Sequence, residues 1–82
     1  MEVSIDISLY PLKEEFKRPI KDFIAKVENS GFKVKKNNMS TSVFGDYSEV
    51  MDWLKNNMEE SLLNDQNAVF VIKVVGGNYY RD

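Results

Sequence analysis

Hydrophobic and polar residues alternate strictly over residues 3–10, with valine, isoleucine or leucine at every odd position. Serine, aspartate or tyrosine occupies every even position. A period of two predicts a strand with two unlike faces, which Pro11 ends. One face belongs to a hydrophobic core and the other offers polar groups, so the fold must contain a sheet with two different sides.

Two segments that follow this strand have features typical of helices. After the charged residues 13–18, which are typical of a loop, apolar residues at i, i+3, i+4 and i+7 predict a helix over residues 19–28. Gly31 can adopt the left-handed conformation beyond its end. A second helix is predicted from Asp46 to about Leu63, because Asp46 and Glu49 have the spacing of a capping box.

Three more strands complete the pattern. Residues 32–35 and 39–44 predict a hairpin that turns at Asn37 and Asn38, and residues 68–75 are hydrophobic on both faces. The order predicts an α+β, ferredoxin-like βαββαβ sandwich, in which two helices cover one face of a four-stranded antiparallel sheet. The first and third strands should be central. We expect one domain over residues 1–82, with residues 76–82 as a loose tail.

Composition removes several classes of function. The 82 residues include no cysteine and no histidine, so disulfides, zinc sites and His-dependent nucleophiles are not expected. We therefore expect no enzyme activity, no metal and no cofactor. Eleven basic and thirteen acidic residues give a net charge of −2, which disfavours nucleic acid. No signal peptide or membrane-spanning apolar segment is recognisable, so a cytoplasmic protein without direct membrane insertion is expected.

The last predicted strand favours self-association. Its residues Val69, Val71 and Val75 would lie on the sheet face that no helix covers, and such a patch is rarely left exposed to water. Chains of this size also often need support beyond their own core. A second copy is the expected cover, in a dimer or a tetramer.

Polar residues on the same face are candidates for a binding site. The first strand carries Asp6, Ser8 and Tyr10 there, and the neighbouring third strand carries the hydroxyl run Ser40, Thr41 and Ser42. A carboxylate, hydroxyls and an aromatic ring suit a polar heterocycle or an organic cation. Simple solvation of a polar strand face is the competing interpretation.

Several of these residues have structural explanations of their own. Adjacent strand residues point to opposite faces, so Ser40 and Thr41 cannot both reach one ligand without a bulge. Asn37 is typical of a turn and Asp46 of a helix cap. Lys73 among valines and Trp53 in the second helix favour structural roles.

Three segments together resemble a known family: residues 5–12, 37–47 and 68–73. They are similar to the thiamine-binding, YkoF-like proteins associated with uptake of hydroxymethylpyrimidine and thiamine. The resemblance implies a ferredoxin-like unit whose sheets pack in pairs, with the vitamin or its pyrimidine bound at the sheet. The best-characterised members of this type carry two such units in one chain, so a dimer or a dimer of dimers of this single unit would rebuild the site.

The resemblance also implies ligand-binding roles for seven residues: Asp6, Ser8, Tyr10, Asn37, Ser40, Thr41 and Ser42. Hydroxyl and amide groups would bond the aminopyrimidine edge, Tyr10 would stack on a ring, and Asp6 would oppose the thiazolium charge. The expected function is non-catalytic binding of thiamine or hydroxymethylpyrimidine at a sheet–sheet interface of an oligomer. The alternative is a structural or regulatory subunit that binds only protein.

Two other functions of this topology are less well supported. An RNA-binding domain needs aromatic residues on its central strands and a favourable charge. A small acyl-phosphate hydrolase needs a phosphate-cradling loop after the first strand, where this chain has Tyr-Pro-Leu-Lys at residues 10–13.

Overall fold

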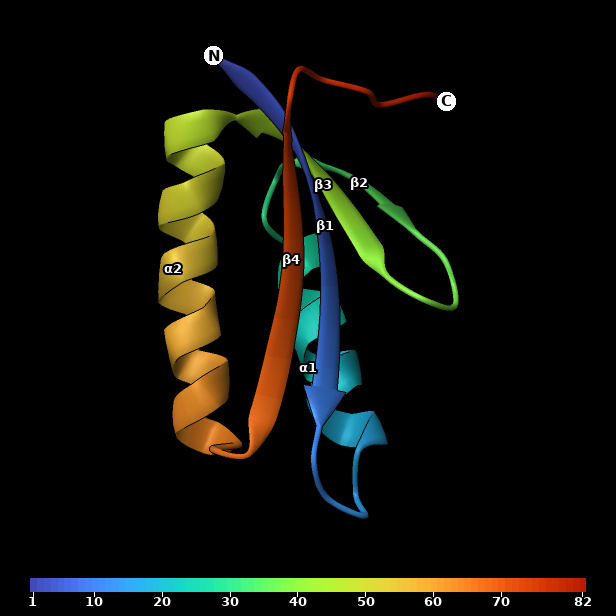
Figure 1. Ribbon diagram of the computed structural model, residues 1–82, viewed down its shortest axis with the longest axis vertical. Coiled ribbons are helices and arrows are strands. Elements are labelled where there is room, and N and C mark those ends of the chain that lie inside the picture. The colour runs from blue at the N-terminus through green and yellow to red at the C-terminus, as the bar shows by residue number, and fades with distance from the viewer.

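The computed structural model describes residues 1–82 and contains six elements in the predicted order (Figure 1). They are β1 (Glu2–Pro11), α1 (Lys17–Glu28), β2 (Lys33–Lys36), β3 (Thr41–Asp46), α2 (Tyr47–Asn64) and β4 (Ala68–Gly76). The strands form one antiparallel sheet in the order β2-β3-β1-β4. The α+β, ferredoxin-like prediction is confirmed, and β1 and β3 are central as expected.

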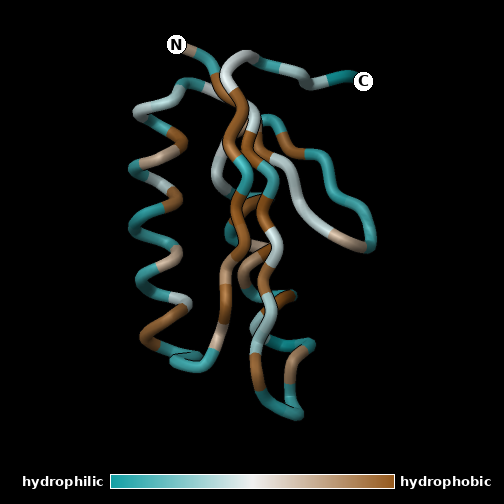
Figure 2. Tube along the Cα trace, viewed as in Figure 1, coloured by the Kyte–Doolittle hydropathy of each residue, from teal (hydrophilic) through white to brown (hydrophobic).

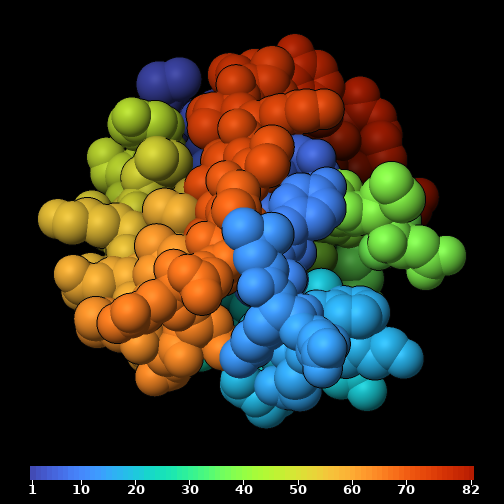
Figure 3. All heavy atoms as spheres, turned by 60° about the horizontal axis from the view of Figure 1, so that its bottom comes forward, coloured from blue at the N-terminus to red at the C-terminus, as the bar shows by residue number.

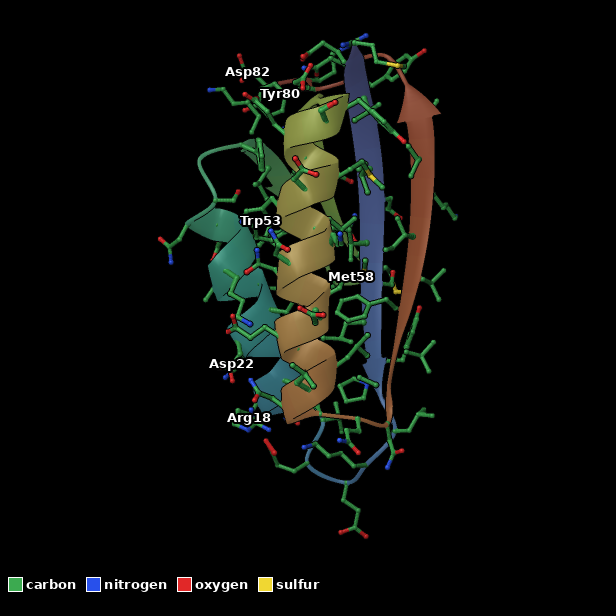
Figure 4. All side chains as sticks on the ribbon, turned by 90° about the vertical axis from the view of Figure 1, so that its left-hand side faces the viewer. Arg18, Asp22, Trp53, Met58, Tyr80 and Asp82 are labelled. Carbon is green, nitrogen blue, oxygen red and sulfur yellow. The ribbon has the colours of Figure 1, made fainter.

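Both helices pack on one face of the sheet, and in Figure 4 they lie to the left of β1 and β4. The odd-numbered residues of β1 point to this side, where Val3, Ile5 and Ile7 are buried with residues of β3, α1 and α2. Trp53 of α2 lies over Phe23 of α1, with ring centroids 6.1 Å apart, which confirms its structural role. The central cluster comprises Val3, Ile5, Ile7, Phe23, Val27, Val43, Val50 and Leu54.

Three predicted boundaries are wrong by two residues: the start of the first helix and both ends of the third strand. The first helix begins at Lys17 because Arg18 bonds Asp22 one turn later, at 3.0 Å, and so stabilises the first turn. The third strand begins at Thr41, because the Asn37 side-chain oxygen accepts from the backbone N–H groups of residues 39 and 40 at 2.7 and 3.0 Å. These bonds form the predicted turn at Asn37 but hold both residues out of the strand. The third strand ends at Asp46 instead of residue 44, because its pairing with β1 continues until Asp46 lies opposite Glu2.

The other expected ends lie within one residue of those observed. Asp46 caps α2 by accepting from the Glu49 N–H at 3.2 Å, as predicted, and this bond holds the pKa of Asp46 below its ordinary value. Gly31 adopts a φ of 90° beyond α1, as the sequence indicated. Neither helix is both long and apolar enough to cross a bilayer.

Residues 77–82 run from the end of β4 across the helix-free face toward β2 and β3 (Figure 1). The Ser4 hydroxyl donates to the Gly77 carbonyl and accepts from the Tyr79 N–H, each at 2.9 Å. The Tyr80 ring lies edge-on to Phe44 at 5.4 Å, and only 7% of Phe44 is exposed. The segment that was expected to be a loose tail therefore makes specific contacts with β1 and β3.

Candidate functional site

The sheet side opposite the helices, called the open face here, carries the even-numbered residues of β1 and a row of valines on β4. Val69, Val71 and Val75 are each between 42% and 50% exposed in the single chain. Figure 2 shows that β4 is hydrophobic along most of its length. The predicted apolar patch is therefore present on this face, next to polar residues of β1.

Asp6 lies at the centre of the open face, opposite Ser42 of β3 and Lys73 of β4. One carboxylate oxygen of Asp6 accepts from the Ser40 hydroxyl at 2.7 Å and from the Ser42 hydroxyl at 3.1 Å. The chain itself thus supplies hydrogen-bond partners for this acid. A shallow depression of about 400 Å³ lies over Asp6, bounded by Phe44 and residues of β4.

Asp6→Ala is expected to lower the free energy of unfolding by about 1–2 kcal/mol, because two half-buried hydroxyls lose their acceptor. Asp6→Asn retains an amide oxygen in the same place and is expected to lose less. Urea unfolding of both variants measures the difference. Equal losses in the two variants would show that these hydrogen bonds contribute nothing to stability.

A larger cavity of about 430 Å³, called the end cavity here, lies where β1 extends beyond β3. The pairing of β1 with β3 stops at Ile7 and Thr41, whereas its pairing with β4 continues to Pro11. The missing length of β3 leaves a space between β1, α1 and the β2–β3 loop. Figure 3 looks at this end of the molecule, where the end of β1 and the following loop (blue) lie between the β2–β3 loop (green) and the end of α2 (orange).

The end cavity is apolar inside and polar along its rim. Its apolar lining includes Leu9, Leu12, Phe16, Ile20, Phe23 and Ile24. Its polar lining includes Ser8, Tyr10, Asn37, Ser40 and Thr41. Five of the seven sequence-predicted site residues therefore meet here, and Asp6 and Ser42 lie on the open face. An apolar cavity with a few polar groups at one edge is typical of a site for a small planar molecule.

Ser40 and Thr41 point to different sides, as the alternation rule requires. The Ser40 hydroxyl bonds Asp6, whereas Thr41 is 5% exposed and lies on the helix side opposite Ile7. The apolar lining from α1 was not identified from the sequence. Its residues Ile20, Phe23 and Ile24 continue the same stripe that forms the core, so no sequence signal distinguishes the cavity wall from the core.

An ion cluster joins the β1–α1 loop, which supplies part of the lining of the end cavity, to the end of α2. The Asp65 carboxylate accepts from Lys13 at 2.6 Å and from Arg18 at 2.9 Å, and its side chain is only 8% exposed. The Lys13 and Arg18 bonds hold the pKa of Asp65 below its ordinary value. Figure 4 shows Arg18 and Asp22 together at this end of α1. The cluster fixes the loop that carries Leu12 and Phe16.

Asp65→Asn is expected to lower the urea midpoint at pH 7 and to lower it by less at pH 3. A carboxylate whose pKa is lowered by folding stabilises the native state above its unfolded pKa of about 3.9, and that stabilisation is lost as the pH falls through the lower folded value. Asp52→Asn, at an exposed position of α2, is the control and should change little at either pH. A midpoint difference for Asp65→Asn that is the same at pH 7 and pH 3 would contradict the assigned role of the ion cluster.

The sequence matches the model of the YKOF-related family over residues 2–73. The chain belongs to the YKOF-related family. This membership confirms the resemblance drawn from residues 5–12, 37–47 and 68–73. A search among curated proteins finds no significant match.

Solved structures share the fold of this YKOF-related chain. A protein from Streptococcus pneumoniae has a TM-score of 0.87 at 22% identity, covering 96% of this chain and 90% of its own. A protein from Thermotoga maritima, provisionally assigned to thiamine biosynthesis or salvage, has a TM-score of 0.83 at 22% identity, covering 98% and 85%. A hypothetical protein from Methanocaldococcus jannaschii has a TM-score of 0.78 at 22% identity, covering 98% and 84%. At this identity the comparison establishes the fold alone.

Proposed function

We propose that this YKOF-related protein binds thiamine or its hydroxymethylpyrimidine moiety, without catalysis, in the end cavity. The observation that carries the proposal is an apolar cavity of about 430 Å³ whose rim holds five of the residues expected to contact this ligand. Family membership supports it, as does the fold shared with the Thermotoga maritima protein. The proposed role is that of a cytoplasmic carrier or sensor.

The chemistry of the lining suits binding rather than reaction. Phe16 and Phe23 can enclose a flat pyrimidine ring, while the Asn37 amide and the Ser40 hydroxyl lie where its polar substituents would point. No carboxylate, amine or thiol lines the cavity itself, so its lining offers a bound ligand apolar contacts and neutral hydrogen-bonding groups. Asp6, which bonds Ser40 at the rim, offers a negative charge to the thiazolium of thiamine.

We further propose that the open face mediates self-association to a dimer or a tetramer. The exposed valines of β4 support this, since a second copy would remove them from water. Val71→Lys should weaken the assembly, whereas Val74→Lys, at an exposed position on the opposite face of the same strand, should not. Light scattering with size exclusion measures both, and an unchanged mass for Val71→Lys would contradict the proposed interface.

Calorimetric titration with thiamine and with hydroxymethylpyrimidine tests the binding proposal. Saturable heat with either compound is expected, together with a rise in the melting temperature. No heat and no thermal shift at millimolar ligand would contradict it. If the protein shows no binding in this titration but Val71→Lys does weaken its oligomer, the two results together would favour the second candidate. That candidate is a structural or regulatory subunit that binds only protein.

A further inference from the structure

The edge of β1, rather than either of its faces, borders the end cavity. Five consecutive residues of β1, 7–11, line the cavity, although successive side chains of a strand point to opposite faces. Because residues of both faces line the same cavity, the cavity must lie beside the backbone of β1, along the edge of the strand. Figure 1 shows β1 continuing past the β2–β3 loop at this point. Beyond Ile7 no strand lies beside this edge.

The direction of the backbone groups along this edge follows from the ladder. In an antiparallel sheet the hydrogen-bonding groups of a strand point to its two neighbours at alternate residues. The Tyr47 N–H donates to the Met1 carbonyl at 2.7 Å, so the odd-numbered residues of β1 point these groups toward β3. The Gly77 N–H donates to the Glu2 carbonyl at 2.8 Å, so the even-numbered residues point toward β4. The N–H and C=O of Leu9 therefore point into the end cavity.

No group of the chain pairs with the Leu9 backbone on that side. Met39 would face Leu9 if β3 continued, but the Met39 N–H donates to the Asn37 side chain at 2.7 Å. The Met39 carbonyl accepts from the Ser8 hydroxyl at 3.3 Å. Unpaired backbone groups beside an apolar surface are costly unless water or a ligand satisfies them. Leu9 thus presents one donor and one acceptor, side by side, to whatever fills the cavity.

We propose that the Leu9 backbone recognises a planar heterocycle that carries an amino group next to a ring nitrogen. The ring nitrogen accepts from the Leu9 N–H, and the amino group donates to the Leu9 C=O. This inference rests on the proposed function, since the aminopyrimidine of thiamine has such an edge. A peptide strand would use the same groups, but Pro11, the next residue that points this way, has no N–H. One donor and one acceptor fit a single ring better than an added strand.

Hydrogen exchange of the backbone amides, measured by NMR on ¹⁵N-labelled protein, tests the free edge without any ligand. The Leu9 N–H is expected to exchange at least about tenfold faster than those of Ser8 and Tyr10, which point toward β4 and are bonded there. Equal protection of the three amides would overturn the inference, whatever the protein binds.

The same measurement with hydroxymethylpyrimidine separates this inference from the proposed function. Once calorimetry shows binding, the Leu9 amide should exchange at least about tenfold more slowly, and the analogue without the amino group should bind about tenfold more weakly. Binding with unchanged Leu9 exchange, or equal affinity for the two compounds, would overturn the inference and leave the proposed function standing. Absence of binding would overturn both.

Discussion

Replacing Leu54 with alanine is expected to lower the free energy of unfolding by about 2–5 kcal/mol. Leu54 is fully buried where α2 packs on the sheet, and the helix cannot close over the space that its side chain leaves. A domain of this size has a total stability of only about 5–15 kcal/mol, so the variant should be partly unfolded at moderate temperature.

Urea unfolding followed by far-UV circular dichroism measures the loss, with Leu63→Ala as the control on the same helix. Leu63 is largely exposed, so its replacement should change the stability by less than about 0.5 kcal/mol. Similar losses in the two variants would contradict the arrangement of α2 on the sheet.

Ile24→Trp is expected to weaken the binding of hydroxymethylpyrimidine by about a hundredfold or more, equivalent to about 2.7 kcal/mol. Ile24 lines the end cavity from α1 and is only half-buried, so an indole at this position can fill the cavity without entering the core. Calorimetric titration of the variant measures the loss.

Lys21→Trp is the matched control, because Lys21 is exposed on the same helix and does not line the cavity. It should bind as the unmodified protein does. A different pattern, in which Ile24→Trp binds normally and Val71→Lys loses the ligand, would place the ligand between the sheets of two protomers. That is the arrangement first expected from the sequence.

The order of elements could be predicted because each has its own periodicity. The alternation over residues 3–10 and the helical stripe over residues 20–27 specify which face of each element is buried, and pairing those faces leaves few topologies. The Asp46 cap and the turn at Asn37 were predictable because they are local, since their hydrogen-bond partners lie within three residues along the chain.

The end cavity could not be predicted, because it depends on where β3 begins. That position is determined by the Asn37 side chain, which holds Met39 and Ser40 outside the strand. The sequence pattern alone extends the strand over both residues and fills the space. The contacts of residues 77–82 were also inaccessible, because the bonds of Ser4 to Gly77 and Tyr79 join residues more than seventy positions apart.

A crystal structure of the protein grown with hydroxymethylpyrimidine tests the central claim most directly. Electron density for the ring is predicted between α1 and the free edge of β1, with the amino group at the Leu9 carbonyl and the ring nitrogen at the Leu9 N–H. The central claim would be contradicted if the end cavity were empty, whether the ring is bound on the open face beside Asp6 or is absent from the crystal.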